Sequence, residues 1–412
     1  MTAKPATPVL SREVSLLRIV AQGLVGATAA PSAAEAVRRQ LAIQGQQVSA
    51  VPHALVVRVA GATGSDVAAA FARGDLVRSW PMRGTVHITT AADHHWLRVA
   101  LMHRLDAWVR RSEAELGISQ ALCEHAAEIA LAAIRERGPL PRAELLDAWA
   151  QAGLMAFAAG KDVSAYRRRH LLVRLQREGV LVQGPRRGNE HLVVDAAPFP
   201  SADSGPAGAG VARGQPGHTA ALAEIARRYA TSHGPISAGD LARWTTLPKR
   251  EAARALENAV EETTATSYRA DTARARVPLV RARADGGVRG RLRILGVGES
   301  APRTGLLYLR ADLPELLEAA RRQALAARFL ASFDELHVGY KDRSCLTGEA
   351  GERLICPAAN GMFRPLLVDR GRLVGVRPVG EGVLWLDGAA PSARVERDIT
   401  RAVAAVEKRL AR

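Results

Sequence analysis

Cysteine is scarce in this chain of 412 residues. The three cysteines, Cys123, Cys345 and Cys356, are widely spread and form no C-x-x-C pair. This pattern argues against a disulfide framework and against a structural zinc site. No apolar run approaches the roughly 18 residues of a membrane helix, and residues 1–8 contain no apolar core of the kind that a secretory signal carries. We therefore expect a cytoplasmic protein that does not enter a membrane.

Lysine is also rare, yet the chain is strongly basic. Lysine and arginine together number 57 against 41 acidic residues, for a net charge of +16, and only five of the 57 are lysines. A GC-rich genome would explain arginine in place of lysine, but it does not explain the excess of positive charge. Such an excess attracts polyanions, and nucleic acid is the commonest large polyanion inside a cell. The charge therefore favours a nucleic-acid-binding protein.

A repeated pattern indicates how the chain is organised. Gly138-Pro139-Leu140 leads to Trp149, and Gly234-Pro235-Ile236 leads to Trp244 in a similar pattern. Apolar spacing predicts helices on both sides of each Gly-Pro, and after the first copy an alternating β-hairpin with its turn at Arg187-Gly188. Three helices followed by a hairpin are typical of a winged helix. The helices expected around the two copies span 123–137, 164–178, 219–232 and 248–260.

A third, more degraded copy is predicted near the N-terminus. Helical periodicity covers 11–25, 33–41 and 65–73, and strands are expected at 76–80 and 84–89. We predict a mainly helical α+β fold with winged-helix units at 10–115, 116–197 and 218–303, and a C-terminal α/β extension at 304–412. Residues 198–217, rich in proline, glycine and alanine, are expected to form a mobile linker with nothing to bury. Further elements are predicted as a strand-like stretch at 263–300 with a turn at 285–287, and helices at 313–333 and 398–410.

The familiar catalytic motifs are absent, but one segment is unusual. The sequence has no P-loop, no H-E-x-x-H and no G-x-S-x-G setting. His94 and His95 are adjacent and so point to different sides, which argues against a metal site. Gln44 and Gln46 lie two residues apart, so on an extended segment both amides face one space and can orient a water molecule. The alternative is a helix C-terminus that runs into a polar turn.

Two further segments are candidates for function. Arg83, Thr85 and His87 alternate and share one strand face, which suits phosphate and water contacts; an exposed face of a wing is an equally good interpretation. The segment 332–344 gathers Asp334, Glu335, Asp342, Lys341 and Arg343 around Tyr340. Its carboxylates could act in acid/base chemistry, but Asp–Arg pairing that fixes a loop is the better interpretation.

These segments resemble a known family. I-Q-G-Q at 43–46, R-S-W-P-M-R-G-T-V-H at 78–87, F-D-E-L-H-V-G-Y-K-D-R-S at 333–344 and N-G-M-F-R-P-L-L-V-D-R-G-R-L-V-G at 360–375 resemble, in this order, motifs of the AlkZ/YcaQ family of bacterial winged-helix DNA glycosylases. The resemblance runs from about residue 10 to 410. It implies three tandem winged-helix units around a basic DNA-binding channel, in agreement with the repeats.

The resemblance also implies an activity. Family members with a Gln-x-Gln motif hydrolyse the N-glycosidic bond of alkylated purines, and the branch is often tied to self-resistance against DNA-alkylating natural products. The catalytic role then falls to Gln44 and Gln46, in a monofunctional enzyme without cofactor or metal. This sequence departs from the pattern at Gly45, where a bulkier residue is usual and which could loosen the turn, and at Gln47, where an acidic residue is common.

Glutamine is not basic, so the substrate must be a good leaving group. A purine alkylated at N7 is cationic and departs through an oxocarbenium-like state that needs mainly a positioned water and nearby dipoles. The implied partner is double-stranded DNA with bulky N7-alkylpurine adducts or crosslinks, bound at the nucleoid by a monomer. The expected DNA-contacting residues, each of which could instead belong to a solvated face, are Arg83, Thr85, His87, Arg167, Arg168, Arg169, Arg174, Arg281, Arg283, Arg289 and Arg291. The alternative function is a non-catalytic winged-helix transcriptional regulator, which has no use for paired amides.

Overall fold

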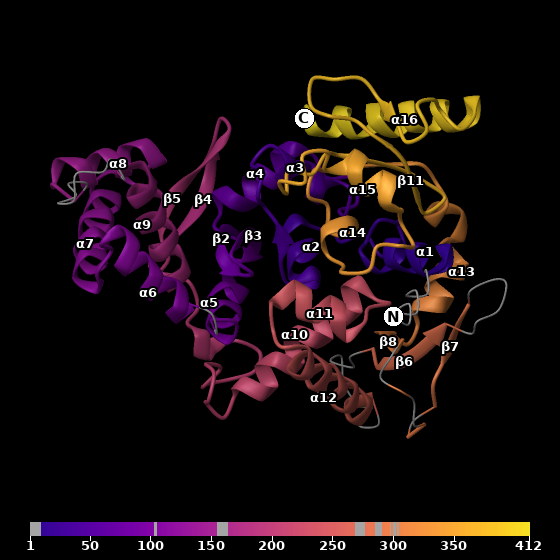
Figure 1. The fold of residues 1–412 in the computed structure, drawn as a ribbon, viewed down its shortest axis with the longest axis horizontal. Helices are drawn as coiled ribbons and strands as arrows, with labels where there is room; N and C mark the ends of the chain where they lie inside the picture. Colours follow the sequence, from indigo (N-terminus) through magenta and orange to yellow (C-terminus); the bar gives the residue numbers. More distant parts are fainter. Residues whose placement is uncertain are drawn as a thin grey trace, which may run out of the picture. The chain divides into compact units, whose positions relative to one another are not determined.

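A computed structural model of the chain describes residues 10–102, 105–154, 164–267, 277–284, 291–296, 298–299, 302 and 305–412 (Figure 1). It contains two compact units. Unit 1 comprises Met1–Gln40, Ala50–Ser65 and Ile225–Arg412, and unit 2 comprises Leu41–Ser49 and Asp66–Glu224. Helices and antiparallel sheets occur together, which confirms the expected mainly helical mixture of α and β structure. The division into three winged-helix units around a channel stays a prediction.

The centre of unit 2 is a five-stranded antiparallel sheet. Its order is β1-β3-β2-β4-β5, so the Gln44 segment lies at one edge. The bounds are β1 Ile43–Gln44, β2 Leu76–Met82, β3 Thr85–Thr90, β4 Leu181–Arg187 and β5 Glu190–Asp195. The helices that accompany the sheet are α4 (Gly64–Ala72), α5 (Ala91–Ala100), α6 (Leu105–Leu116), α7 (Gln120–Arg137), α8 (Arg142–Gln151), α9 (Ser164–Glu178) and the 3₁₀ turn η1 (Ala202–Ser204).

Helices α7, α8 and α9 form a small core next to the β4–β5 hairpin (Figure 1). Ser119 begins α7 by accepting a hydrogen bond from the backbone N–H of Leu122, and Gly138, at φ 78°, ends it. Trp149 on α8 is fully buried and donates its indole N–H to the carbonyl of Ala126. The three helices and the hairpin turn at Arg187-Gly188 were all predicted, and their existence is confirmed.

The segment 198–217 is packed more closely than expected. Gly205 lies so near helix α5 that a Cβ atom there would be 2.6 Å from the ring of Trp96. Val211, further along, is buried. The prediction that this stretch has nothing to bury is therefore wrong, because small residues let the backbone approach the indole.

Unit 1 contains two further sheets and most of the remaining helices. The four-stranded sheet has the order β12-β11-β10-β9 and the three-stranded sheet β7-β6-β8. The strands are β6 (Leu279–Ala284), β7 (Leu292–Ile294), β8 (Leu307–Arg310), β9 (Arg328–Leu330), β10 (Leu366–Asp369), β11 (Arg372–Val376) and β12 (Leu384–Trp385). The helices are α1 (Arg12–Ala21), α2 (Ala33–Gln40), α3 (Ala50–Val56), α10 (His218–His233), α11 (Ala238–Thr245), α12 (Lys249–Ser267), α13 (Leu313–Ala324), α14 (Glu335–Val338), α15 (Glu349–Ile355) and α16 (Ala393–Leu410).

The long helix predicted at 313–333 is wrong beyond Ala324. Residues 328–330 instead pair with β10, and the guanidinium of Arg328 donates to the carbonyls of Ala324 and Ala326 at the end of α13. Phe329 and Leu330 pack into two different apolar clusters, one beneath α16 and one beside α1. Only an extended segment sends successive side chains to opposite faces, so tertiary packing overrides the helical periodicity.

The strand-like stretch predicted at 263–300 is wrong at its start. Helix α12 continues to Ser267, and the hydroxyls of Thr263 and Thr264 bond back to carbonyls one turn earlier, which satisfies them inside the helix. The strands β6 and β7 pair antiparallel. The predicted turn at 285–287 lies outside the described residues.

Candidate functional site

The Gln44–Gln46 segment forms the edge of the unit 2 sheet. Strand β1 is only two residues long and pairs antiparallel with β3, so that Ile43 lies opposite Ile88 and Gln44 opposite His87. The backbone N–H of Gly45 adds a hydrogen bond to the carbonyl of Val86. The segment is therefore extended at Gln44, as one of the two interpretations of the sequence required, and it does not continue helix α2.

The amide of Gln44 is held in one orientation. Nη2 of Arg83 donates to Oε1 of Gln44 at 2.7 Å and lies 3.4 Å from Nε2 of His87. A guanidinium is only a donor, so it selects the oxygen of the amide and directs the Gln44 NH₂ group elsewhere. Nδ1 of His87 lies 2.9 Å from the carbonyl of Thr85 and must carry the proton, which leaves Nε2 to accept from Arg83. Gln44 as a whole is 9% exposed.

Gln46 also lies against β3. Its Oε1 accepts a hydrogen bond of 3.4 Å from the backbone N–H of Val86. Because Gly45 already bonds to the Val86 carbonyl, the Gln46 side chain takes the place that a backbone carbonyl would occupy in a longer strand. The Gln46 amide is thus anchored to β3, the Gln44 amide is held by Arg83 of the turn that precedes β3, and Gln46 is half-buried.

The presence of glycine at position 45 is explained by the side chain of Ile88. A Cβ atom at this position would lie 2.8 Å from Cδ1 of Ile88, and Ile88 is fully buried. The backbone of Gly45 does not lie in the left-handed region, so its conformation does not require glycine. The packing of Ile88 therefore accounts for glycine where the family usually has a bulkier residue. Gln44 and Gln46, on either side of Gly45, both bond to β3, which argues against a loosened turn.

Two of the predicted DNA-contacting side chains are buried and need correction. His87 is 0% exposed and is occupied by Thr85 and Arg83. Arg174 is 2% exposed and joins α9 to the start of α7 through the Ile118 carbonyl and the Gln120 side chain. Neither side chain can touch a phosphate in this structure, because hydrogen bonds inside unit 2 place each of them in the interior.

The other predicted contacts differ in accessibility. Arg83 and Thr85 are half-buried at the β2–β3 turn, Arg167 is largely buried, Arg168 is half-buried and Arg169 is exposed. In unit 1, Arg281 and Arg283 are half-buried on β6 and Arg291 is exposed. Arg289 lies outside the described residues. As DNA contacts, these residues stay predictions.

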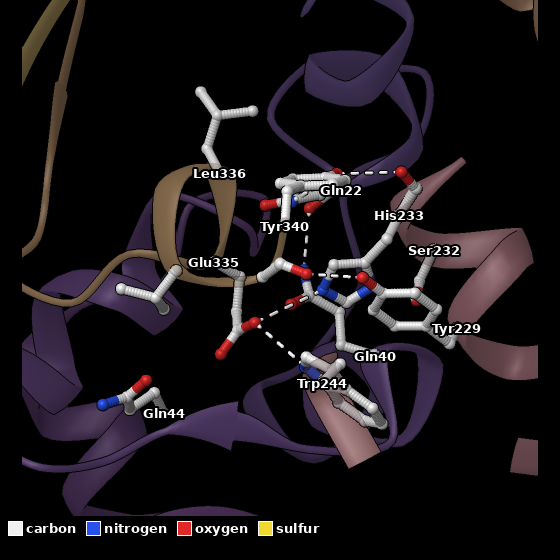
Figure 2. A network of polar contacts seen from close by, with 12 residues as sticks. Gln22, Gln40, Gln44, Tyr229, Ser232, His233, Trp244, Glu335, Leu336 and Tyr340 are labelled. Atoms are coloured by element: carbon white, nitrogen blue, oxygen red, sulfur yellow. Dashed lines mark hydrogen bonds and ion pairs between the residues drawn. The ribbon is translucent and has the colours of Figure 1, made fainter. Parts of the chain in front are cut away.

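The segment 333–343 of unit 1 is the centre of a buried polar network. Both oxygens of Asp334 accept hydrogen bonds of 2.8 Å from Arg58. The hydroxyl of Tyr340 donates to the carbonyl of His233 and accepts from Gln22 (Figure 2). Ion pairs between arginines and carboxylates do fix this loop. Asp334 pairs with Arg58, which lies far away in the sequence, and Arg343 pairs with Glu352.

Glu335 lies deeper in this network. Its Oε2 accepts from the indole N–H of Trp244 at 3.3 Å and lies 3.4 Å from Nε2 of His233 (Figure 2). Burial lowers the pKa of His233 and raises that of Tyr340, so both groups are held neutral. Lys341 is exposed, and only its backbone N–H joins the network, through Asp240. The arrangement is that of a stabilising core.

No group of three potential metal ligands occurs among the described residues. His94, whose adjacency to His95 argued against a metal site, is fully buried, and that burial lowers its pKa well below the usual value. Within the same described part of the chain, no helix is long and apolar enough to cross a membrane.

Two sets of residues were not among the sequence-based candidates. Arg78 on β2 donates hydrogen bonds to the carbonyls of Gly45 and Gln46, although it was quoted only as part of a motif. In unit 1, a groove of about 490 Å³ is lined by Lys249, Arg250 and Arg254 together with Leu306 and Tyr308. The spacing of the three cations at the start of a predicted helix is the signal that could have identified them.

Comparison with known proteins agrees with these features. A family model described as "DNA glycosylase AlkZ-like" matches residues 37–412. Among solved structures, the Streptomyces sahachiroi DNA glycosylase AlkZ is similar in fold, with a TM-score of 0.64 and 21% identity over 97% of each chain. No curated protein sequence matches. The family match includes the Gln44–Gln46 segment and covers most of the chain, which therefore belongs to the AlkZ-like DNA glycosylase family.

Proposed function

We propose that this protein is a monofunctional DNA glycosylase that hydrolyses the N-glycosidic bond of cationic N7-alkylated purines in double-stranded DNA. Gln44 and Gln46 are the proposed catalytic residues. The observation that carries the proposal is that both amides are held at the start of β3: the Gln44 amide is oriented by the guanidinium of Arg83, and the Gln46 amide accepts from the backbone of Val86. Family membership supports the reaction class.

The proposed mechanism follows from what an amide can do. Each amide oxygen has two lone pairs, so Oε1 of Gln44 can accept from Arg83 and also from a water hydrogen, and Oε1 of Gln46 can accept from Val86 and from the second hydrogen. A water held in this way keeps its own lone pairs for attack at C1′ of the sugar. The N-glycosidic electrons leave with the purine, the attacking water loses its extra proton to solvent, and neither amide has to act as a base.

Selectivity for a cationic base follows from the same chemistry. Without a carboxylate or a general acid, the amides supply only orientation and dipoles, which suffice for a leaving group that already carries positive charge. Phosphates on either side of the lesion would offset the positive charge of Arg83. Bulky adducts and interstrand crosslinks from DNA-alkylating natural products are the proposed substrates, in self-resistance or repair at the nucleoid of the cytoplasm.

DNA binding is proposed to depend on accessible cations. These are Arg83, Arg168, Arg169, Arg281, Arg283 and Arg291, together with the groove residues Lys249, Arg250 and Arg254. Each phosphate contact releases counterions, so the logarithm of affinity falls by about 0.9 per contact for each tenfold rise in salt. A monomer with several such contacts needs no partner subunit.

The test is release of free base from a duplex with one N7-alkylguanine. The wild type is expected to release the base and to leave an abasic site that breaks only after heating in alkali. Gln46→Ala and the Gln44→Ala/Gln46→Ala double variant should lose base release while DNA binding persists. Gln47→Ala is the matched control, because it removes an adjacent half-buried amide that makes no hydrogen bond to the described residues. DNA binding by a wild type that releases no base would instead support a transcriptional regulator.

A further inference from the structure

Arg78 is a buried cation on the central strand β2 of unit 2. It lies between Ile88 of β3 and Gln183 of β4 in the sheet register, and it is 8% exposed. Nε donates to the carbonyl of Gly45 at 2.8 Å, Nη2 donates to the carbonyl of Gln46 at 3.3 Å, and Nη1 donates to Oε1 of Gln183. One guanidinium thus connects the Gln44–Gln46 segment to two other strands.

Among the described residues, Arg78 forms no ion pair. Burial lowers its pKa to about 10, and no carboxylate in the described part of the chain counteracts this effect. An apolar side chain would fill this space without the cost of removing a cation from water. Arg78 therefore contributes the rigid, planar arrangement of its N–H donors, which bind the oxygens of Gly45, Gln46 and Gln183 at fixed angles.

The two backbone carbonyls that Arg78 binds lie on either side of the Cα atom of Gln46. The carbonyl of Gly45 belongs to the peptide plane before the Cα atom of Gln46, and the carbonyl of Gln46 belongs to the plane after it. Fixing both planes fixes φ and ψ of Gln46, and with them the direction in which its side chain leaves the backbone. Strand β1 ends at Gln44, so the sheet itself provides no donors for these two carbonyls.

We propose that Arg78 is a positioning residue for base release, which holds both peptide planes around Gln46 and thereby aims its amide at the reacting water. Arg78 touches neither water nor DNA in this role. The proposal rests on the function proposed for Gln44 and Gln46. A misplacement of about 1 Å in a catalytic group can lower a rate by about 100-fold.

The experiment compares Arg78→Gln and Arg78→Lys with Arg98→Gln and Arg98→Lys. Arg98 is the matched control in the same unit: it is also 8% exposed, burial also lowers its pKa to about 10, and it donates to the carbonyl of Arg177, away from residues 41–49. Each variant is assayed for single-turnover base release, duplex affinity, melting temperature and hydrogen exchange of the backbone at 41–49.

Arg78→Gln is expected to lose about 30- to 100-fold in single-turnover rate, with duplex affinity changed less than about threefold. Arg78→Lys, which keeps the charge and loses the fork, should recover only a small part of the rate. Hydrogen exchange at 41–49 should rise at least tenfold in both. The Arg98 variants should melt at a similarly lowered temperature, yet keep the wild-type rate and the protection of 41–49.

Two results would overturn this role for Arg78. One is a folded Arg78→Gln protein that cleaves at the wild-type rate, and the other is unchanged exchange at 41–49. The exchange measurement tests the role even in a protein without activity, whereas absence of base release by the wild type argues against the proposed function alone.

Discussion

Nη2 of Arg83 lies 2.7 Å from Oε1 of Gln44, and the same nitrogen lies 3.4 Å from Nε2 of His87. Arg83 occupies the β2–β3 turn with a left-handed backbone, φ 55°, followed by Gly84 at φ 69°. Because of this turn, the guanidinium of Arg83 contacts Gln44 of β1 and His87 of β3. A group that only donates thereby decides which end of the Gln44 amide is presented to a substrate.

Replacement of Arg83 should therefore affect catalysis. Arg83→Met keeps much of the side-chain volume and removes the donor that orients the Gln44 amide. We expect single-turnover base release to fall about 10- to 100-fold. Titration of the rate against enzyme concentration separates this loss from weaker DNA binding, and a wild-type maximal rate at saturating enzyme would contradict the assignment.

The contact between Gly45 and Ile88 predicts coupling between two substitutions. Gly45→Ala places a methyl group against Cδ1 of Ile88 and should destabilise the protein by about 1–3 kcal/mol, as overpacking usually does. Ile88→Val removes that carbon, so the double variant should be more stable than the sum of the single changes implies. Urea unfolding of the four proteins measures the coupling, and strict additivity would show that the neighbours adjust freely.

His191 should make unit 2 sensitive to acid. Its Nδ1 donates to the carbonyl of Gly184, its ring packs on Phe71, and burial lowers its pKa to about 4. Between about pH 6.5 and pH 4, His191 is protonated in the unfolded chain but neutral in the folded protein. The contribution of His191 to the free energy of unfolding is therefore complete above pH 6.5 and falls as the pH drops through this window. The expected loss is about 3 kcal/mol.

The matching variant for this effect is His191→Phe, which keeps the ring and cannot titrate. At pH 7 it should be less stable than the wild type by about 1 kcal/mol, because one hydrogen bond is lost. By pH 4.5 the difference should shift by about 2–3 kcal/mol in favour of the variant. Chemical denaturation at both pH values measures the shift, and parallel pH profiles for the two proteins would exclude His191 as its source.

The Arg58–Asp334 pair predicts a large effect on stability in unit 1. Both side chains are buried and joined by two hydrogen bonds of 2.8 Å, so Asp334→Asn leaves a buried guanidinium without its counter-charge. We expect the free energy of unfolding to fall by about 3–5 kcal/mol. The exposed pair Arg353–Glu349 is the control, since Glu349→Gln should cost less than about 0.5 kcal/mol. Equal effects in the two variants would refute the distinction.

Much of the local structure was predictable because periodicity and turn residues determine it. The helix at 164–178 and the Arg187-Gly188 turn follow from apolar spacing and from glycine. Contacts between residues far apart in the sequence could not be predicted. The partner of Asp334 is Arg58, 276 positions earlier, and nothing in either local sequence identifies the other. The strand at Phe329 was missed for the same reason, since two separate apolar clusters decide it.

The candidate site shows the same division. Spacing made Gln44, Gln46 and Arg83 candidates, the family resemblance assigned a catalytic role to the two glutamines, and the structure brings Arg83 to Gln44. The role of Arg78 depends on backbone carbonyls, which every residue has, so no side-chain pattern could reveal it. The burial of His87 and Arg174 was also missed, because alternation or an arginine cluster does not tell which face is covered.

The close approach of Gly45 to Ile88 bears on how related chains are found. A pattern search that requires a large middle residue between two glutamines would not find this chain, although its Gln-Gly-Gln segment lies against a neighbouring strand. A search that pairs glycine at this position with a long aliphatic residue on that strand would retrieve it. Exchanging the tripeptide between relatives should accordingly succeed only when the facing aliphatic residue is exchanged with it.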